Sequence, residues 1–194
     1  MRTSRLAKNI CCIEGYWNEA DFRDTSSIKG ALQLLQDNDK VDYAYRRCAT
    51  MPEVVKIITE FCKPSYKDFG IIYFASHGTK SCIRFDDTDV SLDDLAKYFS
   101  NQFTRKIIHF GSCSTIKVDK RNLNKFLCET GAAAVSGYKN DVDFLKSTVL
   151  DLLYFQLCQT SVEVSKIKNA MNSQYSSLAR ELGFRMECNE QFVG

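Results

Sequence analysis

Short apolar segments alternate with amphipathic ones along this chain, and the alternation restricts its fold more than any other feature. Strands are predicted for residues 9–14, 42–47, 69–75, 106–111 and 132–137. Helices are predicted for residues 28–35, 51–63, 92–99, 123–129, 144–159 and 162–182, and a hairpin for 83–90. Strands and helices in this order are typical of a mostly parallel sheet with helices on both faces. The sequence therefore predicts an α/β fold, a three-layer αβα sandwich with a small β-hairpin insertion and two C-terminal helices.

The helix boundaries are predicted from capping residues and apolar stripes. Ser26 or Ser27 is expected to cap the first helix, and Ser91, with Asp94 three residues later, the third. The apolar stripe of the first helix comprises Ile28, Ala31, Leu32, Leu34 and Leu35. The last helix, 162–182, can pack on the sheet or meet a partner, and packing on the sheet is favoured.

Length and charge exclude several classes of protein. A chain of 194 residues with 44% hydrophobic and 26% charged residues is predicted to form one domain, 1–194, rather than a disordered or fibrous protein. Lys+Arg 26 against Asp+Glu 24 provides no electrostatic footprint for nucleic acid. Neither a signal-peptide core nor an apolar stretch of about 20 residues is found, so no membrane association and a cytoplasmic location are expected.

Nine cysteines and only two histidines are the unusual counts. With no CxxC pair, neither a zinc ribbon nor a redoxin motif is present, and no metal or other cofactor is predicted. The acidic stretch 86–94 lacks the Gly and Glu of a calcium-binding loop, which favours a solvated hairpin. Apart from Cys113, the cysteines are expected to be reduced, buried thiols that act as small hydrophobes.

Chemistry-bearing residues follow two consecutive strands of the predicted sheet. Strand 69–75 runs into Ser76-His77-Gly78, and strand 106–111 runs into Ser112-Cys113. Sites in open α/β sheets form at the carboxyl ends of strands, and consecutive strands are usually neighbours. A thiol beside an imidazole is the arrangement of nucleophilic catalysis. The N–H groups of Gly78 and Cys113 are candidate donors to an oxyanion.

Each of these motifs has a structural interpretation when it stands alone. A cysteine at a strand end is usually a buried small residue, and a His-Gly pair is usually a turn. Their joint position at one edge of the sheet favours function for His77 and Cys113. The other histidine, His109, lies within the strand 106–111 and is predicted to be a packed core residue.

The two strand-end motifs together resemble the caspase-like (clan CD) cysteine peptidases, which include caspases, separases and CHAT domains. The shared pattern is an apolar strand ending in His-Gly, followed by an apolar strand ending in a small residue and Cys. Residues 8–160 carry the resemblance, and the pattern is closest to the CHAT and separase types. The resemblance implies a caspase-like fold, in which Cys113 and His77 form a catalytic dyad and the C-terminal helix 162–182 follows the core.

The resemblance also implies an acidic residue after the next strand, which pairs with a basic P1 side chain of the substrate. Asp141 matches that position best, and Asp143 is the second candidate. Both are equally consistent with ordinary loop or helix-capping residues before Phe144. Ser76 and Ser112, which flank the catalytic pair, complete the predicted substrate-binding set. The tryptophan that the family has near this point is missing, since the only tryptophan is Trp17.

We therefore expect a cysteine endopeptidase that acts on a protein or peptide substrate. The short segment 115–122 argues against activation by cleavage into two large pieces, so regulation by an activating partner or a small ligand is expected. The alternative is a catalytically silent caspase-like module that binds a partner or senses a ligand.

Overall fold

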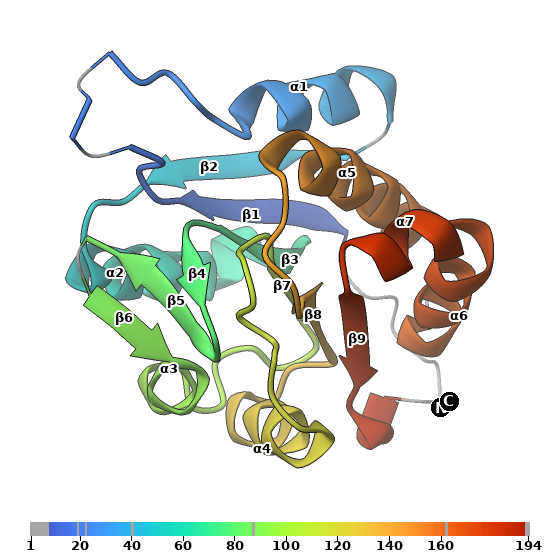
Figure 1. Ribbon diagram of the computed structural model, residues 1–194. Coiled ribbons are helices and arrows are strands. Elements are labelled where there is room, and N and C mark those ends of the chain that lie inside the picture. The colour runs from blue at the N-terminus through green and yellow to red at the C-terminus, as the bar shows by residue number, and fades with distance from the viewer. Residues whose placement is uncertain are drawn as a thin grey trace.

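A six-stranded sheet in the order β2-β1-β3-β7-β8-β9 forms the centre of the structure (Figure 1). The computed structural model describes residues 8–18, 20–21, 23–39, 41–86, 88–161 and 163–192. The strands of this sheet are β1 (Asn9–Glu14), β2 (Tyr43–Arg47), β3 (Phe69–Ala75), β7 (Ile107–Phe110), β8 (Ala134–Tyr138) and β9 (Phe184–Cys188). The first five are parallel and β9 is antiparallel, which confirms the mostly parallel sheet.

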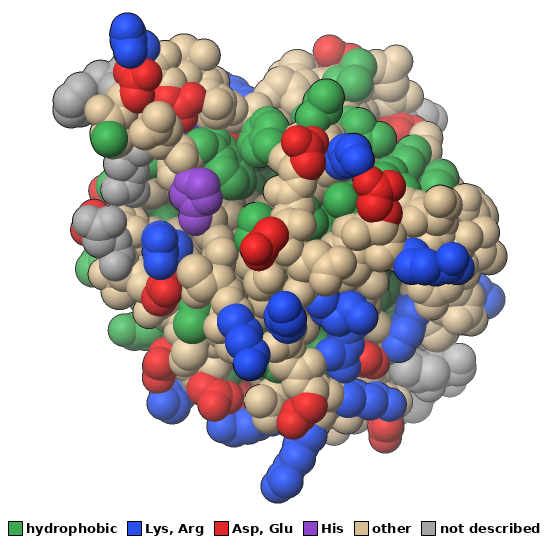
Figure 2. Space-filling view, viewed as in Figure 1, with side chains coloured by type: hydrophobic (Ala, Val, Ile, Leu, Met, Phe, Trp, Pro, Cys, Tyr) green, Lys and Arg blue, Asp and Glu red, His purple; other side chains and the backbone are tan. Residues whose placement is uncertain are grey.

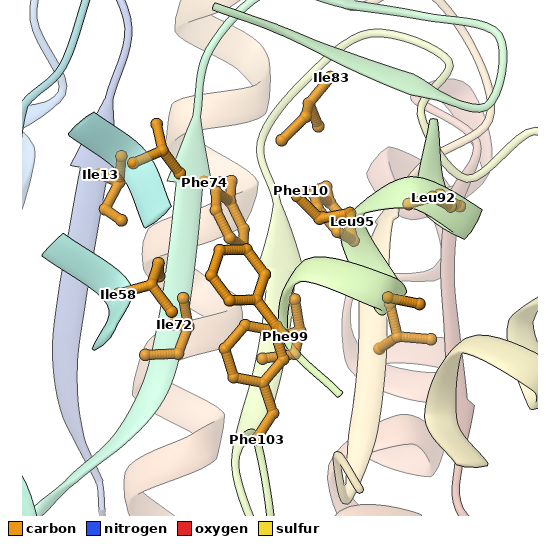
Figure 3. Close-up of a cluster of buried hydrophobic side chains, with 14 of the residues drawn as sticks. Ile13, Ile58, Ile72, Phe74, Ile83, Leu92, Leu95, Phe99, Phe103 and Phe110 are labelled. Atoms are coloured by element: carbon orange, nitrogen blue, oxygen red, sulfur yellow. The ribbon is translucent and has the colours of Figure 1, made fainter. Parts of the chain in front are cut away.

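Helices cover both faces of the sheet and enclose two separate apolar cores. The helices are α1 (Lys29–Asn38), α2 (Met51–Phe61), α3 (Leu92–Tyr98), α4 (Lys120–Thr130), α5 (Phe144–Thr160), α6 (Val164–Gln174) and α7 (Ser176–Glu181), with short 3-10 turns at Pro64–Tyr66 and Glu190–Phe192. One core packs α2, α3 and α4 on the sheet (Figure 3), and the other packs α1, α5, α6 and α7. The predicted three-layer αβα sandwich is confirmed.

The strand β3 shows why an apolar run without polar alternation is needed in this position. Ile72 and Phe74 point into the first core, and Ile71 and Tyr73 point into the second. Side chains alternate across a strand, so a strand covered on both faces buries every residue. Figure 3 shows Phe74 beside Phe110 of β7, and their rings stack at 5.3 Å between centroids.

A small three-stranded sheet, β4 (Gly78–Thr79), β5 (Cys82–Phe85) and β6 (Thr88–Ser91), follows directly after β3. It contains the predicted hairpin, to which β4 adds a strand that was not predicted. The predicted cap of α3 is also confirmed, because the Ser91 hydroxyl accepts a hydrogen bond from Asp94 N–H at 3.1 Å. The core-facing side of the hairpin anchors it through Ile83, Phe85 and Val90.

One prediction about the first helix is confirmed and another is wrong. Ser27 caps α1, because its hydroxyl accepts from Lys29 N–H at 3.1 Å, just after Ile28, whose backbone is already helical. The same hydroxyl also donates to Glu14 at 2.6 Å. Leu34, placed in the buried stripe, is 58% exposed because it faces away from the sheet.

The predicted helix 162–182 is two helices, which meet at Tyr175, followed by a strand that was not predicted. Val162 lies outside the described residues. The break at Tyr175 and the turn at Gly183 (φ 67°) return the chain along the edge of β8, where β9 pairs with it. The helices themselves pack on the sheet, as expected. None of the helices in the described ranges is long and apolar enough to cross a membrane.

Candidate active site

The segments 76–78 and 111–113 meet at the carboxyl edge of the sheet. Their strands, β3 and β7, are parallel neighbours, with Phe74 opposite Phe110. The N–H of Gly111 donates to the carbonyl of Phe74 at 2.9 Å, which continues the pairing past the end of β7. The order of the strands therefore brings together the two motifs that the sequence places far apart.

Gly78 lies against the turn that carries Cys113. A Cβ atom on Gly78 would lie 2.6 Å from the carbonyl oxygen of Cys113 and 2.8 Å from Ser112 Cβ, and closer still to Thr115 Oγ1. Only glycine permits this approach. The carbonyl of His77 accepts from Arg84 N–H at 2.9 Å, so the next pair in the antiparallel ladder, Gly78 with Ile83, is not hydrogen-bonded. The N–H of Gly78 therefore points away from β5.

Cys113 is half-buried, and its sulfur lies against the backbone of Val142. The Sγ atom accepts from Val142 N–H at 3.4 Å and lies 3.8 Å from the carbonyl oxygen of Val142. Ser114, the next residue, has a left-handed φ of 54°, and its N–H donates to the carbonyl of Asn140 at 3.0 Å. The turn at Cys113 is thus tied to the segment between β8 and α5.

His77 is exposed, and its ring is held by Trp17. The Nε2 atom lies 2.6 Å from the carbonyl oxygen of Trp17, and the two rings meet edge to face at 5.4 Å. A carbonyl only accepts, so Nε2 carries the hydrogen, and Nδ1 of the neutral ring keeps its lone pair. In this conformation, His77 bonds Trp17 and Cys113 bonds Val142, and the two side chains do not bond each other. The exposed histidine is purple in Figure 2, beside hydrophobic side chains in green.

The four residues predicted to bind substrate occupy different positions. Asp141 is exposed, and its carboxylate accepts from the Ser114 hydroxyl at 2.8 Å, directly beside Cys113. Asp143 caps α5 by accepting from the N–H of Lys146 at 2.9 Å.

Ser76 and Ser112 are buried beneath the site rather than facing solvent. The hydroxyl of Ser76 donates to the carbonyl of His77 at 3.0 Å. The hydroxyl of Ser112 shares a hydrogen bond with the hydroxyl of Thr115 at 2.7 Å. Each serine hydroxyl therefore forms a hydrogen bond within the segment that carries it, 76–78 or 112–115.

Sequence reasoning missed two residues of this site, Trp17 and Glu14. Trp17 lies between His77 and Phe144, with 5.0 Å between the ring centroids of Trp17 and Phe144. A cavity of about 240 Å³ opens beside it, and its lining includes Tyr16 and His77. The sequence carries one signal for this part of the site, a glutamate at the end of a strand predicted to be buried. In the structure, Glu14 is fully buried.

His109 is fully buried, as predicted, but it belongs to a polar cluster that was not predicted. Its ring bonds the Ser136 hydroxyl at 2.9 Å and Asp151 Oδ1 at 2.7 Å. Asp151 also accepts from the hydroxyls of Tyr73 and Tyr138. Burial and the Asp151 charge raise the pKa of both tyrosines well above its usual value.

All nine cysteines are free thiols. Burial raises the pKa of Cys11 to about 12 and that of Cys48 to about 11, as expected for inert packing residues. Three others, Cys62, Cys82 and Cys188, are only partly buried, and the prediction is wrong for Cys128, which is exposed on α4. Within the described ranges, no group of three or more His, Cys, Asp or Glu side chains is arranged to hold a metal ion.

Comparison with solved structures defines the class of this fold. The Drosophila initiator caspase Dronc is similar with a TM-score of 0.55 at 14% sequence identity, over 98% of this chain and 83% of that chain. The fold is therefore caspase-like. The family described as "Family of unknown function (DUF6642)" matches residues 7–187, and the chain belongs to that family. No curated protein sequence matches it.

Proposed function

We propose that this protein is a cysteine endopeptidase with Cys113 as nucleophile and His77 as the proton carrier. The thiol of Cys113 gives its proton to Nδ1 of His77, and the sulfur attacks the scissile carbonyl carbon. The carbonyl oxygen becomes an oxyanion that accepts from the N–H groups of Gly78 and Cys113. As the C–N bond breaks, His77 protonates the leaving amine. A water that loses its proton to His77 then hydrolyses the thioester and releases Cys113.

The observation that carries this proposal is the packing of Gly78 on the Cys113 turn. A Cβ on Gly78 would lie 2.6 Å from the Cys113 carbonyl oxygen, so the residue after His77 packs directly on this turn. Two backbone N–H groups and a half-buried thiol thus share one strand-end edge. The caspase-like fold supports the same assignment.

Catalysis in this proposal requires a rearrangement of the resting site. The thiol must leave Val142 N–H and turn toward Nδ1 of His77. Catalytic hydrogen bonds are often loose in unliganded enzymes and tighten only with substrate. A bound substrate, an activating partner or a small ligand that moves the segment 140–143 would release the thiol, which supports the proposed regulation.

We assign a basic P1 preference to Asp141, as the resemblance to CHAT and separase domains implies. The carboxylate is exposed beside Cys113 and oriented by the Ser114 hydroxyl, so it can pair with Arg or Lys. Asp143 is the weaker candidate, because its carboxylate already caps α5. With Asp141→Lys, kcat/KM for a Lys or Arg substrate is expected to fall on the order of a hundredfold. An unchanged preference for basic over acidic P1 residues would contradict this assignment.

The nucleophile is tested by Cys113→Ala, with Cys82→Ala as a control on a second half-buried thiol near the site. Cleavage of Arg or Lys peptides is expected to fall by on the order of 10³-fold or more in Cys113→Ala and to stay near wild type in Cys82→Ala. A thiol-directed Lys or Arg peptide electrophile is expected to label Cys113 selectively among the nine cysteines. Full activity in Cys113→Ala would rule out the proposal.

The alternative is a catalytically silent caspase-like module that binds a partner or senses a ligand. One observation favours it, since the thiol and the imidazole each bond a different backbone group. The electrophile distinguishes the two functions. A silent module leaves Cys113 no more reactive than the exposed Cys128, whereas the peptidase reacts first at Cys113.

A further inference from the structure

Glu14 is a fully buried carboxylate at the carboxyl end of β1, and four donors surround it. Its Oε1 accepts from Trp17 Nε1 and from Ile28 N–H, each at 2.7 Å. Its Oε2 accepts from the Ser27 hydroxyl at 2.6 Å and from the Tyr45 hydroxyl. Burying a carboxylate is costly unless donors replace its water, so these four contacts hold Glu14 in one position.

The two oxygens of Glu14 serve different parts of the molecule. Oε2 is bonded by hydroxyls of Ser27 and Tyr45, neither of which contacts the catalytic pair. Oε1 holds the indole of Trp17, whose carbonyl in turn accepts from Nε2 of His77 at 2.6 Å. One residue, Trp17, is therefore fixed through its side chain and fixes the imidazole through its backbone.

We propose that Glu14 is a positioning residue, which orients the imidazole of His77 through Trp17. The inference rests on the proposed function, in which Nδ1 of His77 receives the proton of Cys113. A ring held at Nε2 by a fixed carbonyl presents Nδ1 as its only acceptor. If Trp17 is released from Glu14, the ring can rotate and the two neutral tautomers mix, so fewer molecules hold the productive geometry.

The structure provides a matched set of variants for this proposal. Trp17→Phe removes the indole N–H but retains an aromatic ring against Phe144, and Glu14→Leu removes the acceptor oxygens. Tyr45→Phe is the control, because it also deletes one donor to Glu14 but only at Oε2. We expect kcat to fall on the order of tenfold or more in Trp17→Phe and Glu14→Leu. Tyr45→Phe should stay within about twofold of wild type while losing comparable thermal stability.

A second readout follows the ring itself and needs no activity. Nitrogen NMR of labelled histidine, with the signals assigned by His77→Gln, reports which ring nitrogen carries hydrogen. The wild type and Tyr45→Phe are expected to show the Nε2–H tautomer at His77, and Trp17→Phe and Glu14→Leu a mixture. If Glu14→Leu does not fold, Trp17→Phe decides.

The outcomes separate this proposal from the proposed function. An unchanged tautomer in Trp17→Phe, or a loss of kcat in Tyr45→Phe equal to that in Trp17→Phe, would overturn the positioning role. A wild type with no peptidase activity, together with a tautomer change in Trp17→Phe, would remove the peptidase function and leave the role of Glu14 in orienting His77 intact.

Discussion

At the scale of single residues, the site depends on glycines, which have no side chain to keep neighbouring segments apart. Gly78 and Gly111 are the two clearest cases. A Cβ on Gly111 would lie 2.7 Å from the Tyr73 hydroxyl, and a Cβ on Gly78 would meet the Cys113 turn. Each glycine lets a segment of the proposed site lie directly against its neighbours.

Gly78→Ala tests this close approach. The added methyl group would force the Cys113 turn to shift, so we expect a loss of stability of about 1–3 kcal/mol and a fall in kcat/KM on the order of a hundredfold. Gly30→Ala is the control, because a Cβ at Gly30 in α1 meets nothing within 4 Å. It is expected to stabilise the fold by about 0.4–1 kcal/mol. Equal denaturant midpoints for the two variants would contradict the packing described above.

At the scale of elements, α5 is joined to the sheet by a buried polar cluster as well as by apolar packing. Asp151 of α5 receives hydrogen bonds from His109 of β7, Tyr73 of β3 and Tyr138 of β8. These three strands include β3 and β7, which precede His77 and Cys113. The cluster therefore fixes the helix to the strands that carry the proposed site.

Asp151→Asn is expected to cost at least about 2 kcal/mol of the free energy of unfolding, because an amide has one acceptor oxygen for three donors. The control in the same helix is Asp143→Ala, which removes the N-cap and is expected to cost about 1 kcal/mol. Urea unfolding followed by far-UV circular dichroism measures both. A cost for Asp151→Asn no larger than for Asp143→Ala would show that the cluster does not hold α5.

At the scale of the whole molecule, burial keeps several thiols and phenols neutral in the folded state. Burial raises the pKa of Cys11 and Cys158 to about 12 each and that of Tyr73 well above its usual value. In the unfolded chain these groups ionise at about pH 8.5–10. Above that range the folded state binds more protons than the unfolded state, so stability falls as pH rises.

We therefore expect the free energy of unfolding to decline steadily between pH 8.5 and 11, with the full contribution of these groups present below about pH 8. Denaturation at several pH values, with a reductant to exclude disulfides, measures the slope. Cys158→Ala removes one of these groups and should flatten the slope. A stability that stays constant from pH 8 to 11 would contradict the prediction.

Several features follow from the sequence alone, because local pattern is sufficient to specify them. The run 69–75 has no charged residue and only one polar group, the Tyr73 hydroxyl, which predicts a strand covered on both faces, as β3 is. Ser91 with Asp94 was enough to locate the start of α3. His77 and Cys113 lie within three residues of the ends of β3 and β7, and because these strands are neighbours, the segments that carry them lie at the same edge of the sheet.

Only the tertiary structure decided which groups surround those two residues. Trp17 lies 60 residues before His77, and the contact between them depends on the path of a loop that has no periodic pattern. The strand β9 is defined by pairing with β8 rather than by its mixed sequence Phe-Arg-Met-Glu-Cys. Glu14 and Asp151 are buried because distant donors reach them, and the number of donors around a carboxylate is a property of packing. The strand ends identify the two candidate catalytic residues, whereas the three-dimensional packing determines their hydrogen-bond partners.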